Sequence, residues 1–110
     1  MTIHSESRHG MLILRPDQSA DYLAAEEIRE RLAIAIGDGA TALILDLSLA
    51  RHASASVLQV VCNAARQLRT TRGRIAIAGA GAQFRDLLRI SGAAQLVLVF
   101  DTLEEAQAHF

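Results

Sequence analysis

The sequence has no lysine, only one cysteine and no long apolar run, and each absence excludes a class of function. Its eleven basic residues are all arginine, and twelve acidic residues bring the formal net charge to −1. A chain without net positive charge lacks the electrostatic basis for non-specific binding to nucleic acid or to an anionic membrane. Cys62 has no second cysteine with which to form an internal disulfide, and we expect it to be a buried, reduced thiol. The N-terminal segment lacks the apolar centre of a secretion signal, so we expect a cytoplasmic protein without membrane insertion.

The chain contains enough apolar residues for one core. It has 110 residues, of which 51% are hydrophobic, and this predicts one domain over residues 1–110. Patterns typical of strands and helices alternate in the order ββαβαβαβα. This order predicts an α/β fold with a mixed, mostly parallel sheet and about four helices. The predicted strands are 3–9, 11–15, 42–47, 74–79 and 95–100, and the predicted helices begin near 21, 56, 82 and 102.

Apolar spacing predicts which side of each helix faces the core. In the first helix the predicted inward residues are Leu23, Ile28, Leu32 and Ile36. The second helix is expected over residues 56–71. Its predicted inward residues are Leu58, Val61, Cys62, Ala65 and Leu68, with Arg66, Arg69 and Arg72 turned toward solvent or a partner.

The most informative segment runs from residue 42 to residue 65. It reads as a buried strand ending in Asp46, a polar loop carrying Ser54 and Ser56, and the start of the second helix. A hydroxyl at a helix N-terminus meets free backbone N–H groups and the positive end of the helix dipole. Such a serine can therefore cap the helix, or it can present a modifiable oxygen to a partner. The sequence leaves both interpretations open.

Several local patterns resemble the STAS domain, the fold of bacterial anti-sigma factor antagonists. The family's strand ending in Asp-Leu-Ser leads to Asp-Ser-Ser-Gly at a helix start. In this sequence Asp-Leu-Ser at 46–48 leads to Ser-Ala-Ser-Val at 54–57 with the same spacing. The segments 72–93 and 100–106 are similar to the family's later segments, and Asp21 falls on the acidic position before its first helix. The resemblance covers nearly the whole chain.

The resemblance implies a non-enzymatic module that binds a protein partner. The partner is either an anti-sigma factor of the ATPase-kinase type or a component of a chemotaxis or transporter assembly, and the resemblance also allows a homodimer. It implies that Ser56 is the phosphoacceptor, with Ser54 as a second hydroxyl in the same loop. The family's acidic residue, first serine and glycine are replaced by Ser54, Ala55 and Val57. The implied partner-binding residues are Asp21, His52, Ser54, Ser56, Val57, Gln59, Asn63 and Arg66.

Two other functions remain open at this point. Residues 58–69 also resemble a degenerate STAS subgroup found with chemotaxis genes, which implies a scaffold or adaptor subunit of a chemotaxis or lipid-transport assembly. The Gly-x-Gly turn at 79–81, followed by Asp101, imitates a dinucleotide-binding turn and suggests a small nucleotide-binding protein. Phe84 occupies the position of that motif's third glycine, however. We therefore expect no cofactor.

Catalytic and metal-binding patterns are weak. The histidines at 4, 9, 52 and 109 lack the close pairing or cysteine neighbours of a metal site. Asp46, His52 and Ser54 are residue types of a catalytic triad, but no Gly-x-Ser-x-Gly motif accompanies them. We expect neither catalysis nor a bound metal.

Overall fold

The computed structural model describes residues 3–8 and 10–110, and it has the predicted order of elements. His9, which the sequence places at the end of the first strand, lies outside the described residues. Two short 3₁₀ helices, η1 and η2, follow the second and third α-helices. The elements are β1 (Ile3–Arg8), β2 (Met11–Pro16), α1 (Tyr22–Gly37), β3 (Ala42–Asp46), α2 (Ala55–Leu68), η1 (Arg69–Thr71), β4 (Arg74–Ala78), α3 (Ala82–Ser91), η2 (Ala93–Gln95), β5 (Leu98–Phe100) and α4 (Leu103–His109).

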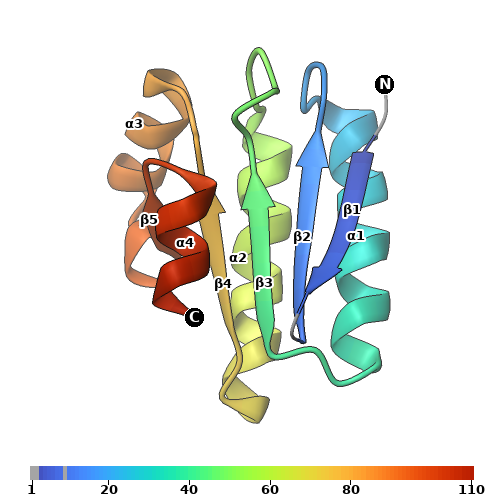
Figure 1. The fold of residues 1–110 in the computed structure, drawn as a ribbon. Helices are drawn as coiled ribbons and strands as arrows, with labels where there is room; N and C mark the ends of the chain where they lie inside the picture. The colour runs from blue at the N-terminus through green and yellow to red at the C-terminus, as the bar shows by residue number, and fades with distance from the viewer. Residues whose placement is uncertain (1–2, 9) are drawn as a thin grey trace.

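The five strands form one sheet in the order β1-β2-β3-β4-β5. Strands β1 and β2 form an antiparallel hairpin, and β2 to β5 are parallel. The predicted mixed, mostly parallel sheet is therefore confirmed. Because parallel strands end at the same edge, the loops that follow β2, β3 and β4 gather there, at the top of Figure 1.

The two faces of the sheet are covered unequally. Helices α1, α2 and α3 lie on one face and α4 lies on the other (Figure 1). Leu43 and Leu45 of β3 belong to the larger core under α1, α2 and α3, whereas Ile44 belongs to the smaller core under α4. Small side chains, Ala76 and Ala78 of β4, let the short α4 pack closely through Ala106.

The predicted inward faces of α1 and α2 need correction. Leu23 is exposed, and α1 instead buries Ala24 and Ala25 in its first turns. The buried face of α2 is shifted from the predicted one, so that Leu58 and Cys62 are only half-buried. The predicted buried thiol is therefore a free cysteine at the margin of the core. Residues buried along α2 are Val57, Val60, Val61, Ala64, Ala65 and Leu68.

The last strand is shorter than predicted. The apolar run at 95–100 was expected to form a strand throughout, but only Leu98–Phe100 is paired. Its partner residues in β4 are Ala76 to Ala78, where β4 ends. The residues before Leu98 take part in η2 and the turn after it, which connect α3 to the sheet.

Candidate functional site

The candidate site lies where the β3–α2 loop, residues 47–54, meets the first turn of α2. This loop is joined to the β2–α1 loop by backbone hydrogen bonds between segments more than thirty residues apart. The Ala20 N–H donates to the His52 carbonyl at 2.9 Å, and the Ser54 N–H donates to the Ala20 carbonyl at 2.9 Å. The Arg51 N–H donates to the Gln18 carbonyl at 3.1 Å. These bonds fix the backbone immediately before α2.

Asp46 fixes the other end of the loop. It is a buried charged residue, 2% exposed, and its Oδ2 accepts a hydrogen bond from Nε of Arg15 at 2.9 Å. Its Oδ1 accepts from the Ser48 N–H at 3.0 Å. The negative charge of the Asp46 carboxylate is thus neutralised by Arg15 of β2. The same carboxylate also holds the first turn of the loop, which gives the Asp-Leu-Ser motif a structural role.

The two candidate serines occupy different environments. Ser54 is the N-cap of α2, as one sequence interpretation predicts, but its hydroxyl makes no capping bond. Its Oγ is buried without a hydrogen-bond partner. Ser56 lies one residue inside the helix, where it is partly exposed, and its hydroxyl makes no hydrogen bond within the described part of the chain.

Val57 belongs to the core. The sequence places it among the partner-binding residues, but its side chain is 0% exposed and faces the sheet. The reason is the shifted buried face of α2, which turns positions 57, 60, 61 and 64 inward. A partner on the outside of the molecule cannot contact this side chain.

The remaining predicted partner-binding residues of α2 share one outer surface. Gln59, Asn63 and Arg66 are exposed, and Arg66 Nη1 donates to Asn63 Oδ1 at 3.1 Å. They border a groove of about 480 Å³ between α2 and the segment 91–96, with half-buried Leu58 and Cys62 in its lining. We call Gln59, Asn63 and Arg66 the outer stripe of α2. Together with the groove, this stripe offers apolar surface framed by polar groups.

Two further predicted residues lie at the carboxyl edge of the sheet. His52 is exposed on the β3–α2 loop. Asp21 caps α1, because its Oδ1 accepts from the Ala24 N–H at 3.0 Å. Its carboxylate thus has a structural use while the residue itself remains exposed.

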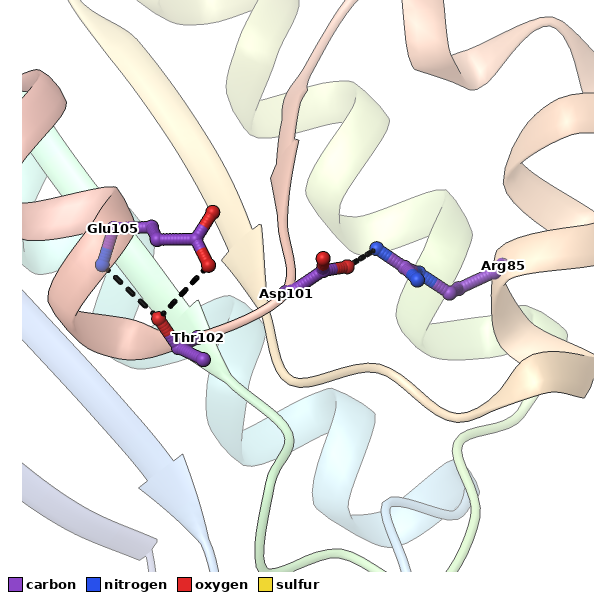
Figure 2. A network of polar contacts seen from close by, with 4 residues as sticks. All are labelled: Arg85, Asp101, Thr102 and Glu105. Carbon is purple, nitrogen blue, oxygen red and sulfur yellow. Dashed lines mark hydrogen bonds and ion pairs between the residues drawn. The ribbon is translucent and has the colours of Figure 1, made fainter.

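The Gly-x-Gly turn at 79–81 has a structural explanation. Gly79 has φ +68, and a Cβ there would lie 2.8 Å from the Cβ of Ser48. Glycine therefore allows β4 to turn against the β3–α2 loop. Phe84, at the place of the third glycine, is buried in the core under α3. The acidic residue of the imitated motif, Asp101, forms an ion pair with Arg85 of α3 (Figure 2).

Figure 2 also shows how α4 begins beside that ion pair. Thr102 is its N-cap, and its Oγ1 accepts a hydrogen bond from the Glu105 N–H at 3.1 Å. The Glu105 carboxylate lies 3.4 Å from the same hydroxyl. Thr102 rather than Asp101 is thus the N-cap of α4, and Asp101 pairs with Arg85 of α3.

No ligand cluster gathers around the described histidines. His4 lies 3.2 Å from Asp17, and His109 packs near Phe100. Among residues 3–8 and 10–110, no group of three His, Cys, Asp or Glu side chains could hold a metal ion. Within the same residues, no helix is both long and apolar enough to cross a membrane.

Comparison with known proteins identifies the family. The model of the STAS domain matches residues 2–106, so the chain belongs to the STAS domain family. It is 28% identical to BtrV of Bordetella bronchiseptica, named as an anti-sigma factor antagonist, over 100% of this chain and 95% of that protein.

Solved structures share the fold. A Thermotoga maritima protein, also named as an anti-sigma factor antagonist, superposes with a TM-score of 0.87 at 18% identity, over 97% of this chain and 92% of that one. The phosphorylated form of SpoIIAA from Bacillus superposes with a TM-score of 0.80 at 24% identity, over 98% of each chain. At such identities these likenesses establish the α/β architecture and strand order. The fold class predicted from the sequence is therefore confirmed.

Two features of the site were missed by sequence reasoning. One is the pairing of the two loops, which uses backbone atoms and leaves no residue pattern. The other is Leu49, which is half-exposed at 51% beside the Asp-Leu-Ser motif. No periodic pattern signals it, because alternation would place Leu49 on the same side as Leu47, which is buried.

Proposed function

We propose that this chain is a regulatory protein-binding module that acts as an anti-sigma factor antagonist. The observation that carries the proposal is the loop fixed by Asp46 and Ala20, which presents the first turn of α2 in one position. A loop held in advance loses little conformational entropy when a partner docks on it. Membership in the STAS family supports the same reading.

Ser56 is the phosphoacceptor in this proposal, and Ser54 is not. A kinase must reach the hydroxyl oxygen, and the Oγ of Ser54 is buried. Ser56 is partly exposed and lies in the first turn of α2, where free N–H groups tolerate a phosphate. The phosphate would add about −1.5 to −2 charges. Against an apolar partner surface this charge produces a desolvation cost and breaks the complex.

The valine that replaces the family's glycine is compatible with this role. The side chain of Val57 faces the core, away from the side on which a kinase would approach Ser56. Its added bulk is therefore accommodated by packing under α2, so that the approach to the hydroxyl stays open.

The geometry favours binding over catalysis. The Asp46 carboxylate accepts hydrogen bonds from Arg15 and from the Ser48 N–H. The Ser54 hydroxyl makes no hydrogen bond to a base. A serine nucleophile requires a base within hydrogen-bond reach. The proposed partner is an anti-sigma factor of the ATPase-kinase type that docks on His52, Ser56 and the stripe of Gln59, Asn63 and Arg66.

The test is purification of the tagged chain from its own cells, with mass spectrometry of the bound proteins and of the loop peptide. We expect a histidine-kinase-like ATPase in the complex and phosphate on Ser56. With that ATPase and ATP, Ser56→Ala should take up no phosphate, while the matched control Ser54→Ala should be modified like the wild type.

Two outcomes would contradict the proposal. Phosphate on Ser54 would reverse the assignment of the acceptor. Capture of chemotaxis or transporter subunits without an ATPase would favour the scaffold function instead.

A further inference from the structure

The turn that follows α2 carries three arginines without a carboxylate partner in the described residues, which we call the arginine patch: Arg69, Arg72 and Arg74. All three are exposed. They come from η1, from the turn after it and from the start of β4. The patch therefore lies at the amino edge of the parallel strands, at the bottom of Figure 1, opposite the serine loop.

The patch stands out because most other arginines are neutralised. Within residues 3–8 and 10–110, six of the eleven form ion pairs with carboxylates, as Arg15 does with Asp46 and Arg85 with Asp101. None of the three arginines in the patch has a carboxylate partner in the described part of the chain. Asp38, at the end of α1 near the same edge of the sheet, pairs with none of them.

The sequence explains this segregation of charge. Between Asp46 and Asp86 there is no acidic residue, and the segment between them contains six arginines. Helix α2, η1 and β4 all fall inside this segment. Three of its arginines, Arg69, Arg72 and Arg74, follow the end of α2 closely, and no carboxylate of their own segment can neutralise them.

Helix capping explains part of the patch. Cations near a helix C-terminus interact favourably with the free carbonyl groups, and Arg69 stands directly after the last residue of α2. The hydroxyls of Thr70 and Thr71, however, already donate to carbonyls in that last turn. Arg72 and Arg74 lie beyond the helix and gain little from its dipole.

The backbone gives a second indication at Arg72. Its φ is +59, and among the described residues it is the one non-glycine position with positive φ. Glycine and asparagine adopt this conformation with less strain. Arg74 is held differently: its Nη1 lies 3.4 Å from Nε2 of His109, and its guanidinium lies 6.0 Å from the centre of the Phe110 ring. At Arg72 the chain thus keeps a long cationic side chain on a backbone conformation that favours glycine or asparagine.

We propose that the arginine patch is a second docking surface and that its occupant is an acidic polypeptide segment of a partner protein. Guanidinium groups bind carboxylates through paired donors, so clustered unpaired arginines are complementary to clustered Asp and Glu side chains. A membrane is disfavoured because the large exposed apolar side chains belong to α1, the β3–α2 loop and α3, with none in the patch. A nucleic acid is disfavoured by the net charge of −1.

The surface is independent of the serine loop. Helix α2 separates the two, with Ser56 in its first turn and Arg69 directly after its last residue. A partner could therefore be held by an acidic segment at one end while its folded domain engages the other end.

The experiment measures binding of a fluorescein-labelled, glutamate-rich peptide by fluorescence anisotropy. We expect binding at low ionic strength that weakens as salt is added, because exposed charges are screened. The variant Arg69→Gln/Arg72→Asn should weaken binding by roughly fivefold, as expected for the loss of two exposed ion pairs. Asparagine tolerates positive φ, so this variant should fold.

The matched control is Arg29→Gln/Arg51→Gln, which removes the same charge elsewhere and should bind like the wild type. Equal weakening by both double variants would reduce the effect to net charge and overturn the proposal. So would the lack of salt-sensitive peptide binding. Tighter binding to phosphatidylglycerol vesicles or duplex DNA would show a different partner class, and salt-sensitive self-association in sedimentation would show a second copy as the occupant.

Discussion

The two ends of helix α2 differ in how their polar groups are held. At the N-terminal end, Ser54 and the loop before it are fixed by hydrogen bonds between backbone segments and by the buried carboxylate of Asp46. At the C-terminal end, Arg69 and Arg72 are exposed and have no carboxylate partner in the described residues. The first end is therefore part of the folded framework, whereas the second adds charge to its surface.

This difference predicts which substitutions should change stability and which should change binding. Changes at the N-terminal end should alter the free energy of unfolding when they remove a buried partner. Changes at the C-terminal end should alter binding and leave stability nearly unchanged. The first predictions below test this contrast.

The largest expected effect on stability is at Asp46. We expect Asp46→Ala to lower the free energy of unfolding by about 2 kcal/mol, because it removes the partner of Arg15 and leaves the Ser48 N–H without its acceptor. Urea denaturation measures the change. Arg69→Ala serves as the comparison at the other end and should change stability by less than about 0.5 kcal/mol. Equal losses from the two variants would refute the contrast.

The next effect concerns binding through the outer stripe of α2. We expect Arg66→Glu to weaken binding of the cognate partner by about tenfold, because it reverses an exposed charge beside Asn63 in the proposed interface. Its stability should change by no more than about 0.5 kcal/mol.

Helix α1 provides the control for this variant. Arg29→Glu and Arg31→Glu should weaken binding much less, since both side chains already pair with carboxylates of their own helix. If Arg66→Glu binds like the wild type while Arg29→Glu abolishes the complex, the interface lies on α1.

Ser54→Ala should have a smaller effect than an ordinary N-cap substitution. Replacing a capping serine by alanine costs about 1 kcal/mol, because a helix N–H loses its acceptor. Here the hydroxyl makes no capping bond and is buried without a partner, so the change should lie within about 0.5 kcal/mol of zero. Thermal and urea unfolding measure it. A loss of about 1 kcal/mol in the free energy of unfolding would show that the hydroxyl accepts a capping hydrogen bond in solution.

Nucleotides should produce no effect at all. Phe84 packs in the core where a dinucleotide site needs glycine, and Asp101 is paired with Arg85. A ligand that binds only the folded state raises the melting temperature by mass action. NAD or GTP near a millimolar should therefore leave the melting temperature unchanged. A clear rise would instead support the small nucleotide-binding protein.

The sequence was sufficient for the order of elements, because the strands are short apolar runs separated by clear helix signals. It was insufficient for the face of α2. Apolar residues occupy so many positions from Val57 to Leu68 that several inward faces fit the pattern, and packing against β4 and α1 selects one of them. Val57 and Cys62 were misplaced for this reason.

The candidate site shows a similar division. The serines and their spacing from Asp46 are visible in the sequence, and so is the possibility of an N-cap. The burial of the Ser54 hydroxyl depends on the pairing of Ala20 with the loop, which involves backbone atoms alone. The absence of acidic residues between Asp46 and Asp86 is readable in the sequence, but only the fold places the turn after α2 at the amino edge of the parallel strands.

The most direct test of the account is titration calorimetry of the ATPase-kinase partner with the wild type, Ser56→Ala and Ser56→Glu. The account predicts that Ser56→Ala binds like the wild type, because the hydroxyl itself makes no hydrogen bond in the described structure. Ser56→Glu should bind about tenfold or more weakly, because its charge imitates the phosphate at the interface. Equal affinity of the alanine and glutamate variants would contradict the central claim that Ser56 is the switch.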